Sequence, residues 1–381
     1  MKDIRTRIVD AKLTSPVPDR DFRVDLFRGL ALWLIFIDHS PENALANMTL
    51  KNFGFSDAAE IFVFLSGLAS GRVYGTVARE SGFVAASRRA LRRGFQIYLA
   101  ELLLFWLYVA EVSFLARWRT MFLHDANIAI FLAHPVRGFV EVMGLRYSPV
   151  NIDVLILMVI LHLALPAILP AVMWRPRLTL IASALIYSAA HLFGWAIPAY
   201  PVGTLYFNPL TWQLLYVIGV WWGATQPKPP TSLNVTALTI VAAVLLVVSL
   251  AIAPTSKIWS IDLVAATLGY PIYPIDKGNF DFIRLIHFLV LAFVCYRFVP
   301  SNNAVLRSRA ARPLVQCGEH SLIIYCLGVL LAFAAHAVLT LVANGLLIQI
   351  VVTAAGIAAM SATAALLSRF DRSLQSHPRT I

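Results

Sequence analysis

Long apolar segments dominate this sequence and constrain its fold more than any other feature. About ten of them approach the roughly 20 residues that a helix needs to cross a lipid bilayer. They cover residues 24–40, 56–75, 94–116, 151–173, 178–195, 209–225, 234–253, 281–299, 318–340 and 345–367. Only 13% of the 381 residues are charged, about half the share in an average soluble domain. The sequence therefore predicts an all-α polytopic membrane protein with about ten transmembrane helices.

The basic residues indicate how these helices are oriented. Most of the 31 Lys and Arg residues fall in alternate connections and in the two chain ends. Because Lys and Arg accumulate on the cytoplasmic side of membrane proteins, we expect both termini there. This gives cytoplasmic tails at 1–23 and 368–381 and a single transmembrane domain at 24–367, surrounded by membrane lipids. The net charge of +11 is then mainly a topology signal, so nucleic acid is not expected as a partner. The oligomeric state stays open.

Ionisable residues inside the apolar segments are the best functional candidates. Each costs about 2.5–3.5 kcal/mol at the centre of a membrane helix, so such residues usually have a role. They concentrate in the first four segments: Asp25, Arg28, Asp38, His39, Asp57, Glu60, Arg72, Glu101, Glu111 and Asp153. The three cysteines lack metal-site spacing, and we expect no metal.

Arg28 and His39 stand eleven residues apart in the first segment. In an α-helix this spacing places both side chains on one face, about 16 Å apart along the axis. A guanidinium suits phosphate groups, and an imidazole suits proton transfer near neutral pH. One long phosphate-bearing cosubstrate would reach both residues. The alternative is that Arg28 only anchors the helix and pairs with Asp25.

Carboxylates near His39 are candidates for orienting its ring. Asp57 and Glu60 share a helix face at the level of His39, and either would stabilise an imidazolium as the third member of a triad does. Asp38 directly precedes His39 and so points about 100° away. We therefore expect Glu60 to be the partner, with Asp57 and Asp38 as alternatives.

Small and basic residues follow in the second segment. Ser66, Gly67, Ser70 and Gly71 have the spacing that lets two helices approach closely, so we expect them to pack. Beyond them lie arginines that set topology and are also candidates for binding the phosphates of a cosubstrate: Arg72, Arg88, Arg89, Arg92 and Arg93.

At this point the sequence resembles a known group of enzymes. RVDLFRGLALWLIFIDHS (23–40) and DAAEIFVFLSG (57–67) are similar to the start of membrane acyltransferases of the acyltransferase-three type, which have an Arg, ten residues and then a catalytic His. A closer resemblance, to the OpgC family of succinyltransferases of osmoregulated periplasmic glucans, extends through residues 148–166, 207–223, 280–292 and 317–336.

The resemblance implies a bacterial inner-membrane O-acyltransferase. It would move a succinyl group from cytoplasmic succinyl-CoA to hydroxyls of a periplasmic glucan, with His39 as general base or acyl carrier and Arg28 as its companion. The phosphates of CoA would lie near SRRALRR (87–93) or RSRAARP (307–313). The same resemblance draws attention to further candidates for substrate binding: Asp153, Trp212, Gln213, Arg284, His287 and Ser321.

Several alternatives remain. Arg284, Gln213 and Ser321 are candidates for stabilising the thioester oxygen, and Arg284 is also our candidate for selecting a terminal carboxylate. His287 either lines the glucan site or packs. The acyl group or glycan acceptor can differ within the superfamily. A proton-coupled transporter would also explain buried charges, although it would spread them through the later helices, where few occur.

Overall fold

The computed structural model describes residues 21–227, 233–300 and 303–376. Within them the fold is all-helical and has no β-strand, which confirms the all-α part of the expected fold class. The cytoplasmic position of both termini stays a prediction. The long helices are α2 (Phe22–Asp38), α3 (Ala58–Leu115), α7 (Asp153–Trp174), α8 (Pro176–Phe193), α9 (Pro209–Thr225), α10 (Leu233–Lys257), α12 (Phe282–Phe298), α14 (Ser321–Leu341) and α15 (Leu346–Ser376).

Shorter helices form the connections. Several of them stand in two long connections between the apolar segments, 117–150 and 254–280. These elements are η1 (Ala44–Met48), η2 (Leu50–Asn52), α4 (Met121–Asp125), α5 (Ala129–Ala133), α6 (Pro135–Met143), α11 (Leu263–Leu268), η3 (Ala304–Arg307) and α13 (Arg312–Glu319).

Every apolar segment expected from the sequence is largely helical. By length and hydropathy, five helices among the described residues can cross a membrane: α3, α7, α10, α14 and α15. This identifies a membrane protein, and the count of ten spans stays a prediction. Residues 1–20 of the expected N-terminal tail lie outside the described residues. At the other end α15 continues to Ser376, so the first part of the expected C-terminal tail is helical.

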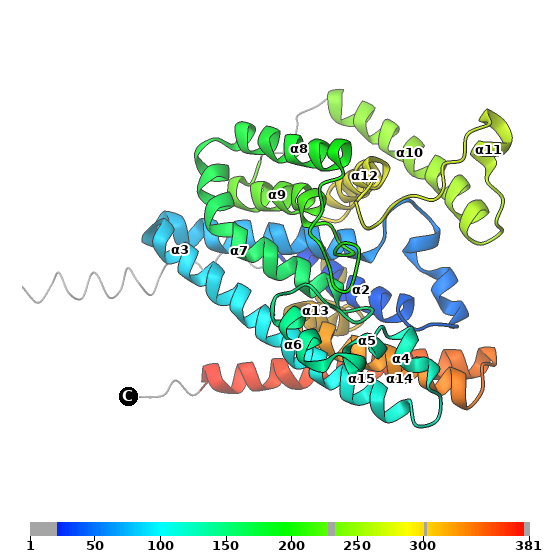
Figure 1. Cartoon of the computed structure of the whole chain (residues 1–381). Helices are drawn as coiled ribbons and strands as arrows, with labels where there is room; N and C mark the ends of the chain where they lie inside the picture. Colours follow the sequence, from blue (N-terminus) through cyan, green and yellow to red (C-terminus); the bar gives the residue numbers. More distant parts are fainter. Residues whose placement is uncertain (1–20, 228–232, 301–302, 377–381) are drawn as a thin grey trace, which may run out of the picture.

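One helix accounts for two of the expected segments. α3 has 58 residues, and Gly82 interrupts it with a φ of 84°. Two helical arms meet at this glycine, and they contain the expected segments 56–75 and 94–116 (Figure 1). The connection between those segments is therefore helical on both sides of Gly82 rather than a loop, because it is rich in Ala and Arg, which favour helix.

Glycines allow the central helices to approach closely. A Cβ added at Gly29 of α2 would lie 1.9 Å from the carbonyl oxygen of Leu314 in α13. Cβ atoms added at Gly67 and Gly71 of α3 would lie 2.3 and 2.1 Å from carbonyl oxygens of α9. The packing expected from the small residues of the second segment is confirmed at these two positions. The backbones of α2 and α3 are thereby fixed against their neighbours.

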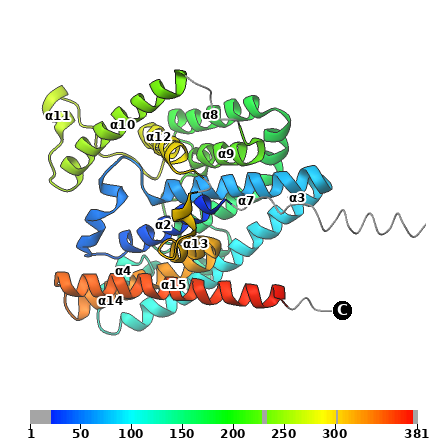
Figure 2. The same cartoon turned by 180° about the vertical axis from the view of Figure 1, so that it is seen from behind.

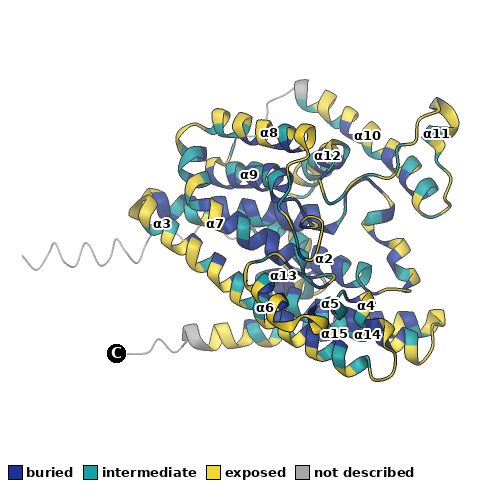
Figure 3. Cartoon of the chain, in the orientation of Figure 1, coloured by how far each residue is buried: buried dark blue, intermediate teal, exposed yellow. Residues whose placement is uncertain are grey.

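α2 and the first arm of α3 lie at the centre of the bundle. The group α8, α9, α10 and α12 lies on one side, and α14 with α15 lies on the other (Figures 1 and 2). The central helices are largely buried, whereas α10 and α15 are mostly exposed (Figure 3). In the most apolar stretch of each helix, α7 is 56% buried and α10 only 11%, so α10 presents apolar side chains at the surface of the bundle. The polar residues of the first four expected segments thus fall in the interior.

Candidate active site

His39 lines a cavity of about 500 Å³ where α2, α3, α7 and α14 end or begin. We call it the His39 cavity. Its charged lining residues come from four stretches of chain: Asp38, His39, Lys51, Asp57, Asp153 and Lys277. Tyr206, Phe207 and Tyr325 add aromatic surface, which suits a sugar ring. The cavity therefore joins a titratable imidazole, carboxylates and ammonium groups in one space.

His39 caps the C-terminus of α2, where its backbone N–H donates to Ile35 O at 3.0 Å. The Nδ1 atom of its ring is buried and has no hydrogen-bond partner among the described residues. Asp38 instead accepts a hydrogen bond from Thr49 at 2.5 Å and lies 3.4 Å from Lys51 Nζ. The preceding aspartate is therefore engaged away from the imidazole, as its direction on the helix predicts.

Asp57 connects the cavity with a buried ion-pair network. It caps α3 by accepting the Ala59 N–H at 2.8 Å. Its Oδ2 atom lies 2.8 Å from Lys277 Nζ and 3.1 Å from Arg284 Nη2. Since Asp57 also lines the His39 cavity, its carboxylate is the better placed of the two acids at the start of α3 to act on His39.

Glu60 takes a different position from the one that its helical spacing suggested. Its fully buried side chain pairs with Arg284, Nη2 to Oε1, at 2.6 Å. Its Oε2 atom accepts the backbone N–H of Asp57 at 2.8 Å, which completes a capping box. Glu60 is not among the residues that line the His39 cavity. A buried carboxylate is stabilised by the nearest cation, and here that cation comes from α12.

Lys277 is the cation of the cavity that lies closest to this network. Burial by itself would lower the pKa of Lys277, but the carboxylates of Asp57 and Glu60 raise the pKa above its ordinary value. The side chain therefore stays an ammonium. Its Nζ also lies 5.8 Å from the centroid of the Phe207 ring.

The loop that carries Lys277 is held by α8 and α9. Trp212 Nε1 donates to the carbonyl oxygens of Lys277 and Gly278, at 3.1 Å each. The Asn208 side chain donates to Asn279 Oδ1 at 3.1 Å, and the Tyr187 hydroxyl donates to Phe280 O at 2.8 Å. Trp212 is fully buried, so its indole holds this loop against α9.

The other substrate-binding candidates are divided by the structure. Asp153 lines the His39 cavity at the start of α7. Gln213 bonds Ser183 of α8 through both atoms of its amide, at 2.6 and 2.8 Å. The ring of His287 is buried between Ser56, at 2.7 Å, and Ser249, at 3.1 Å. Gln213 and His287 therefore hold helices together, and neither lines the His39 cavity.

A second, smaller cavity of about 160 Å³ lies further along the same helices. We call it the Arg28 cavity. Arg28 donates to Leu65 O at 3.1 Å and lies 3.8 Å from Asp25. It therefore pairs with Asp25, as the alternative interpretation had it, and also lines the Arg28 cavity. The other polar residues of its lining are Ser66, Ser70, Tyr74, Arg93, His162 and Ser321.

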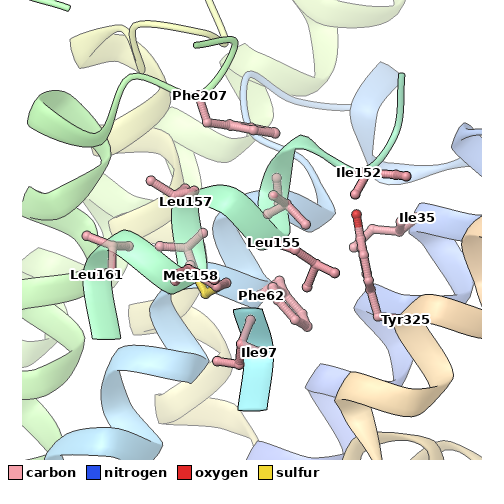
Figure 4. Packing of buried hydrophobic residues seen from close by; sticks show 14 of the residues in the cluster. Ile35, Phe62, Ile97, Ile152, Leu155, Leu157, Met158, Leu161, Phe207 and Tyr325 are labelled. Atoms are coloured by element: carbon pink, nitrogen blue, oxygen red, sulfur yellow. The ribbon is translucent and has the colours of Figure 1, made fainter. Parts of the chain in front are cut away.

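A layer of apolar side chains separates the two cavities. Phe62 and Leu155 line the Arg28 cavity, whereas Ile35 and Tyr325 line the His39 cavity. The rings of Phe62 and Tyr325 lie 5.9 Å apart, and Figure 4 shows the four side chains gathered from α2, α3, α7 and α14. Both cavities therefore belong to one interval between the same four helices.

The remaining arginine candidates lie outside this interval. Arg72 is 3.4 Å from Asp21 and lines an apolar groove between α2, α3, α9 and α12. Arg88, Arg89 and Arg92 are exposed on the second arm of α3. Of the five arginines of α3 that were candidates for binding phosphates, only Arg93 shares a cavity with Arg28.

Sequence reasoning missed Lys277, Lys51 and Tyr325 as residues of the site. Lys277 stands in the long connection 254–280, and long connections in a compact domain are often functional. Nothing near it in sequence indicates that it reaches Asp57, because the two residues meet only through the packing of α9 and α12.

Comparison with known proteins gives one match. A family model described as OpgC protein matches residues 20–372. A search of curated proteins finds no match. The matched range includes every residue of the two cavities and of the ion-pair network between α3 and α12.

Proposed function

The chain belongs to the OpgC family, and on this basis we propose that it is a membrane O-acyltransferase that succinylates periplasmic glucans. Family membership supports a glucan succinyltransferase-like role. The observation that carries the proposal is the His39 cavity, where a half-buried imidazole, Asp57 and Lys277 line one space. The protein would lie in the bacterial inner membrane, with succinyl-CoA supplied from the cytoplasm and the glucan from the periplasm.

His39 would act as the general base of the transfer. A sugar hydroxyl becomes a good nucleophile when a base removes its proton in the transition state. The imidazole takes that proton while the sugar oxygen forms a bond to the thioester carbon. The carbon–sulfur bond then breaks, and the CoA sulfur takes the proton back from the imidazolium. Proton and electron pair are balanced, and no further reactant is needed.

Asp57 and Lys277 carry opposite charges and would stabilise different parts of the transition state. The carboxylate of Asp57 would stabilise the imidazolium. The ammonium of Lys277 would stabilise the negative charge that develops on the thioester oxygen, which is usually a large contribution to catalysis. Lys277 replaces Arg284 in this role, because Lys277 lines the His39 cavity and Arg284 is not among its lining residues.

The two cavities suggest how a cytoplasmic donor would reach a periplasmic acceptor. The donor would pass through the Arg28 cavity, and its thioester would reach His39 when the Phe62–Tyr325 layer moves aside. A direct transfer and a route through an acyl group on His39 both fit this path. In the second route, the neutral His39 imidazole attacks the thioester carbon, the carbon–sulfur bond breaks, and the CoA sulfur takes the ring proton. The sugar oxygen then attacks the acyl-imidazole, and its proton passes to the imidazole nitrogen that leaves.

A different acyl group on the same chemistry is the second candidate. The two lysines of the His39 cavity already face aspartates, Lys51 with Asp38 at 3.4 Å and Lys277 with Asp57 at 2.8 Å. Neither Lys51 nor Lys277 is therefore an obvious partner for the terminal carboxylate of succinate. An acetyl or other acyl group would use the same base and the same cation.

The test uses purified wild-type protein and the His39→Ala and His39→Gln variants in lipid nanodiscs. Each is incubated with succinyl-CoA or acetyl-CoA and a cyclic or linear β-glucan, and CoA release and product mass are followed. We expect succinylated glucan from the wild type and none from either variant at equal thermal stability. A wild type that releases no CoA with any donor would refute the acyltransferase. Acetylated product alone would establish the second candidate.

A further inference from the structure

A third cavity lies away from the two described above, between η3, α13 and the end of α15. Its volume is about 510 Å³, and it shares no lining residue with the His39 or Arg28 cavity. Four arginines line it, so we call it the arginine cavity: Arg307, Arg309, Arg312 and Arg372. Arg307, Arg309 and Arg312 come from the stretch that joins η3 to α13, and Arg372 meets them from α15, about 60 residues further along the chain. All four residues are exposed.

Two of these guanidinium groups are held in place. Arg372 Nε donates to Ser368 O at 3.0 Å. Arg307 lies over the ring of Phe22, 5.7 Å from its centroid. A guanidinium has five N–H donors, and among the described residues most of the donors of both groups have no hydrogen-bond partner. Side chains fixed before binding lose less entropy when a ligand arrives.

The floor of the cavity is also built. Ser368 is buried, and its hydroxyl donates to Glu319 Oε2 at 3.1 Å. His320 Nε2 lies 3.1 Å from the same hydroxyl. These contacts join the end of α13 to α15, so the two walls of the cavity are held at a fixed spacing.

The charge of the lining favours an anion. Glu319 and Asp371 are its two acids, against the four arginines. The planar fork of Arg matches two oxygens of a phosphate at once, which makes such contacts strong and selective. Ser308 and Gln316 add neutral donors to the lining.

We propose that the arginine cavity binds phosphate groups. The proposal rests on the proposed function where it names a source, because succinyl-CoA carries a 3′-phosphate and a pyrophosphate into a protein whose basic side faces the cytoplasm. An anionic lipid headgroup offers the same chemistry. The arginines of both basic clusters considered for CoA are mostly exposed. RSRAARP (307–313) places three of them in one cavity, whereas SRRALRR (87–93) contributes Arg93 alone to the Arg28 cavity.

The experiment measures binding rather than turnover. Wild type is compared with Arg309→Gln/Arg312→Gln and with the charge-conserving Arg309→Lys/Arg312→Lys, all in phosphatidylcholine nanodiscs. Arg88→Gln/Arg89→Gln is the matched control for loss of two positive charges. CoA and dephospho-CoA, which lacks the 3′-phosphate, are titrated against each protein. A second arm measures retention of phosphatidylglycerol in mixed nanodiscs.

We expect the Gln pair to weaken CoA binding about tenfold or more, the Lys pair to weaken it less, and the α3 control to bind as wild type does. Weak wild-type binding of dephospho-CoA would assign the site to the 3′-phosphate. Loss of phosphatidylglycerol retention alone would support the phosphate site with a lipid headgroup as its source. Unchanged binding of both ligands by the Gln pair would overturn the proposal. If the Gln pair binds as wild type does and wild type turns over succinyl-CoA, the arginine-cavity proposal fails and the proposed function stands. If the Gln pair loses binding but wild type turns over no donor, the proposed function fails and the phosphate site stands.

Discussion

Arg284 and Glu60 form a buried ion pair, 2.6 Å from Nη2 to Oε1, although 224 residues separate them in the sequence. The exposed fractions of the two side chains are 6% and 0%. The pair fixes the start of α3 against α12, and Asp57 extends it to Lys277 and the His39 cavity. Because the site is built on this pair, its removal affects both stability and activity.

Breaking the pair from one side is expected to destabilise the protein strongly. Glu60→Gln leaves the Arg284 charge short of a partner, and losing one member of a buried pair costs about 3–5 kcal/mol. We expect a large fall in the thermal unfolding midpoint in nanodiscs, and a smaller fall for Glu60→Met/Arg284→Met, which removes both charges.

The matched control is Arg137→Met. Arg137 lies 3.9 Å from Glu141, but its side chain is 70% exposed, and such pairs contribute about 0–1 kcal/mol. A Glu60→Gln midpoint equal to that of this control would contradict the assigned role of the pair.

Lys277 is expected to act on the transition state rather than on substrate binding. Removing one group that stabilises an oxyanion typically lowers kcat about 10²–10³-fold. Lys277→Met should therefore lower kcat with little change in KM for the acyl donor, and Lys277→Arg should keep part of the rate. Lys257→Met is the control, because Lys257 donates to Gly54 O at 3.1 Å and does not line the His39 cavity. Equal kcat values for Lys277→Met and wild type would exclude this role.

The pH dependence follows from the same two residues. The base is the neutral imidazole of His39, and the group that stabilises the thioester oxygen is the ammonium of Lys277. The raised pKa of Lys277 keeps its ammonium charged beyond the ordinary value of 10.5, so loss of that charge cannot lower the rate at mildly alkaline pH. We expect a plateau up to about pH 9, in steady-state rates corrected for donor hydrolysis. A fall of kcat below about pH 9 that is absent in Lys277→Arg would contradict this prediction, because Lys277 would then lose its proton in that range.

The close approach of α3 and α9 is expected to tolerate no side chain at Gly71. A Cβ there would lie 2.1 Å from Val220 O, whereas a Cβ at Gly345 has no atom within 4 Å. Gly71→Ala must separate two backbones, so it should cost at least the roughly 1–3 kcal/mol of an overpacked core. Gly345→Ala should leave the unfolding midpoint unchanged. Similar midpoints for the two variants would mean that the helices can move apart freely.

The Arg28 cavity is expected to be required for CoA donors and not for the chemistry at His39. Ser66→Leu would place a larger side chain in this cavity and should slow transfer from succinyl-CoA. A small succinyl thioester without a nucleotide, supplied from the periplasmic side of reconstituted vesicles, reaches the His39 cavity directly and should react at the wild-type rate. Equal slowing with both donors would indicate a general defect instead of a blocked passage.

The sequence predicted the helices and several of the residues that line the two cavities, among them Arg28, His39 and Asp57. Apolar runs of the right length must become helices in a membrane, because only there are their backbone groups satisfied. Helical periodicity also relates residues within one helix. The positions of Arg28 and His39 and the close packing of Gly67 and Gly71 could therefore be predicted without knowing which other helix lies beside them. For this reason the long helices agree closely with the ten expected segments.

The tertiary structure decided which charges meet. Local spacing suggested Glu60 as the partner of His39, but Arg284 attracts Glu60 from α12 and leaves Asp57 at the cavity. Lys277 reaches His39's cavity only because Trp212 and Asn208 hold its loop. Such contacts depend on how distant segments pack and on the high cost of an unpaired charge in a low-dielectric interior, and neither is encoded in the spacing of neighbouring residues.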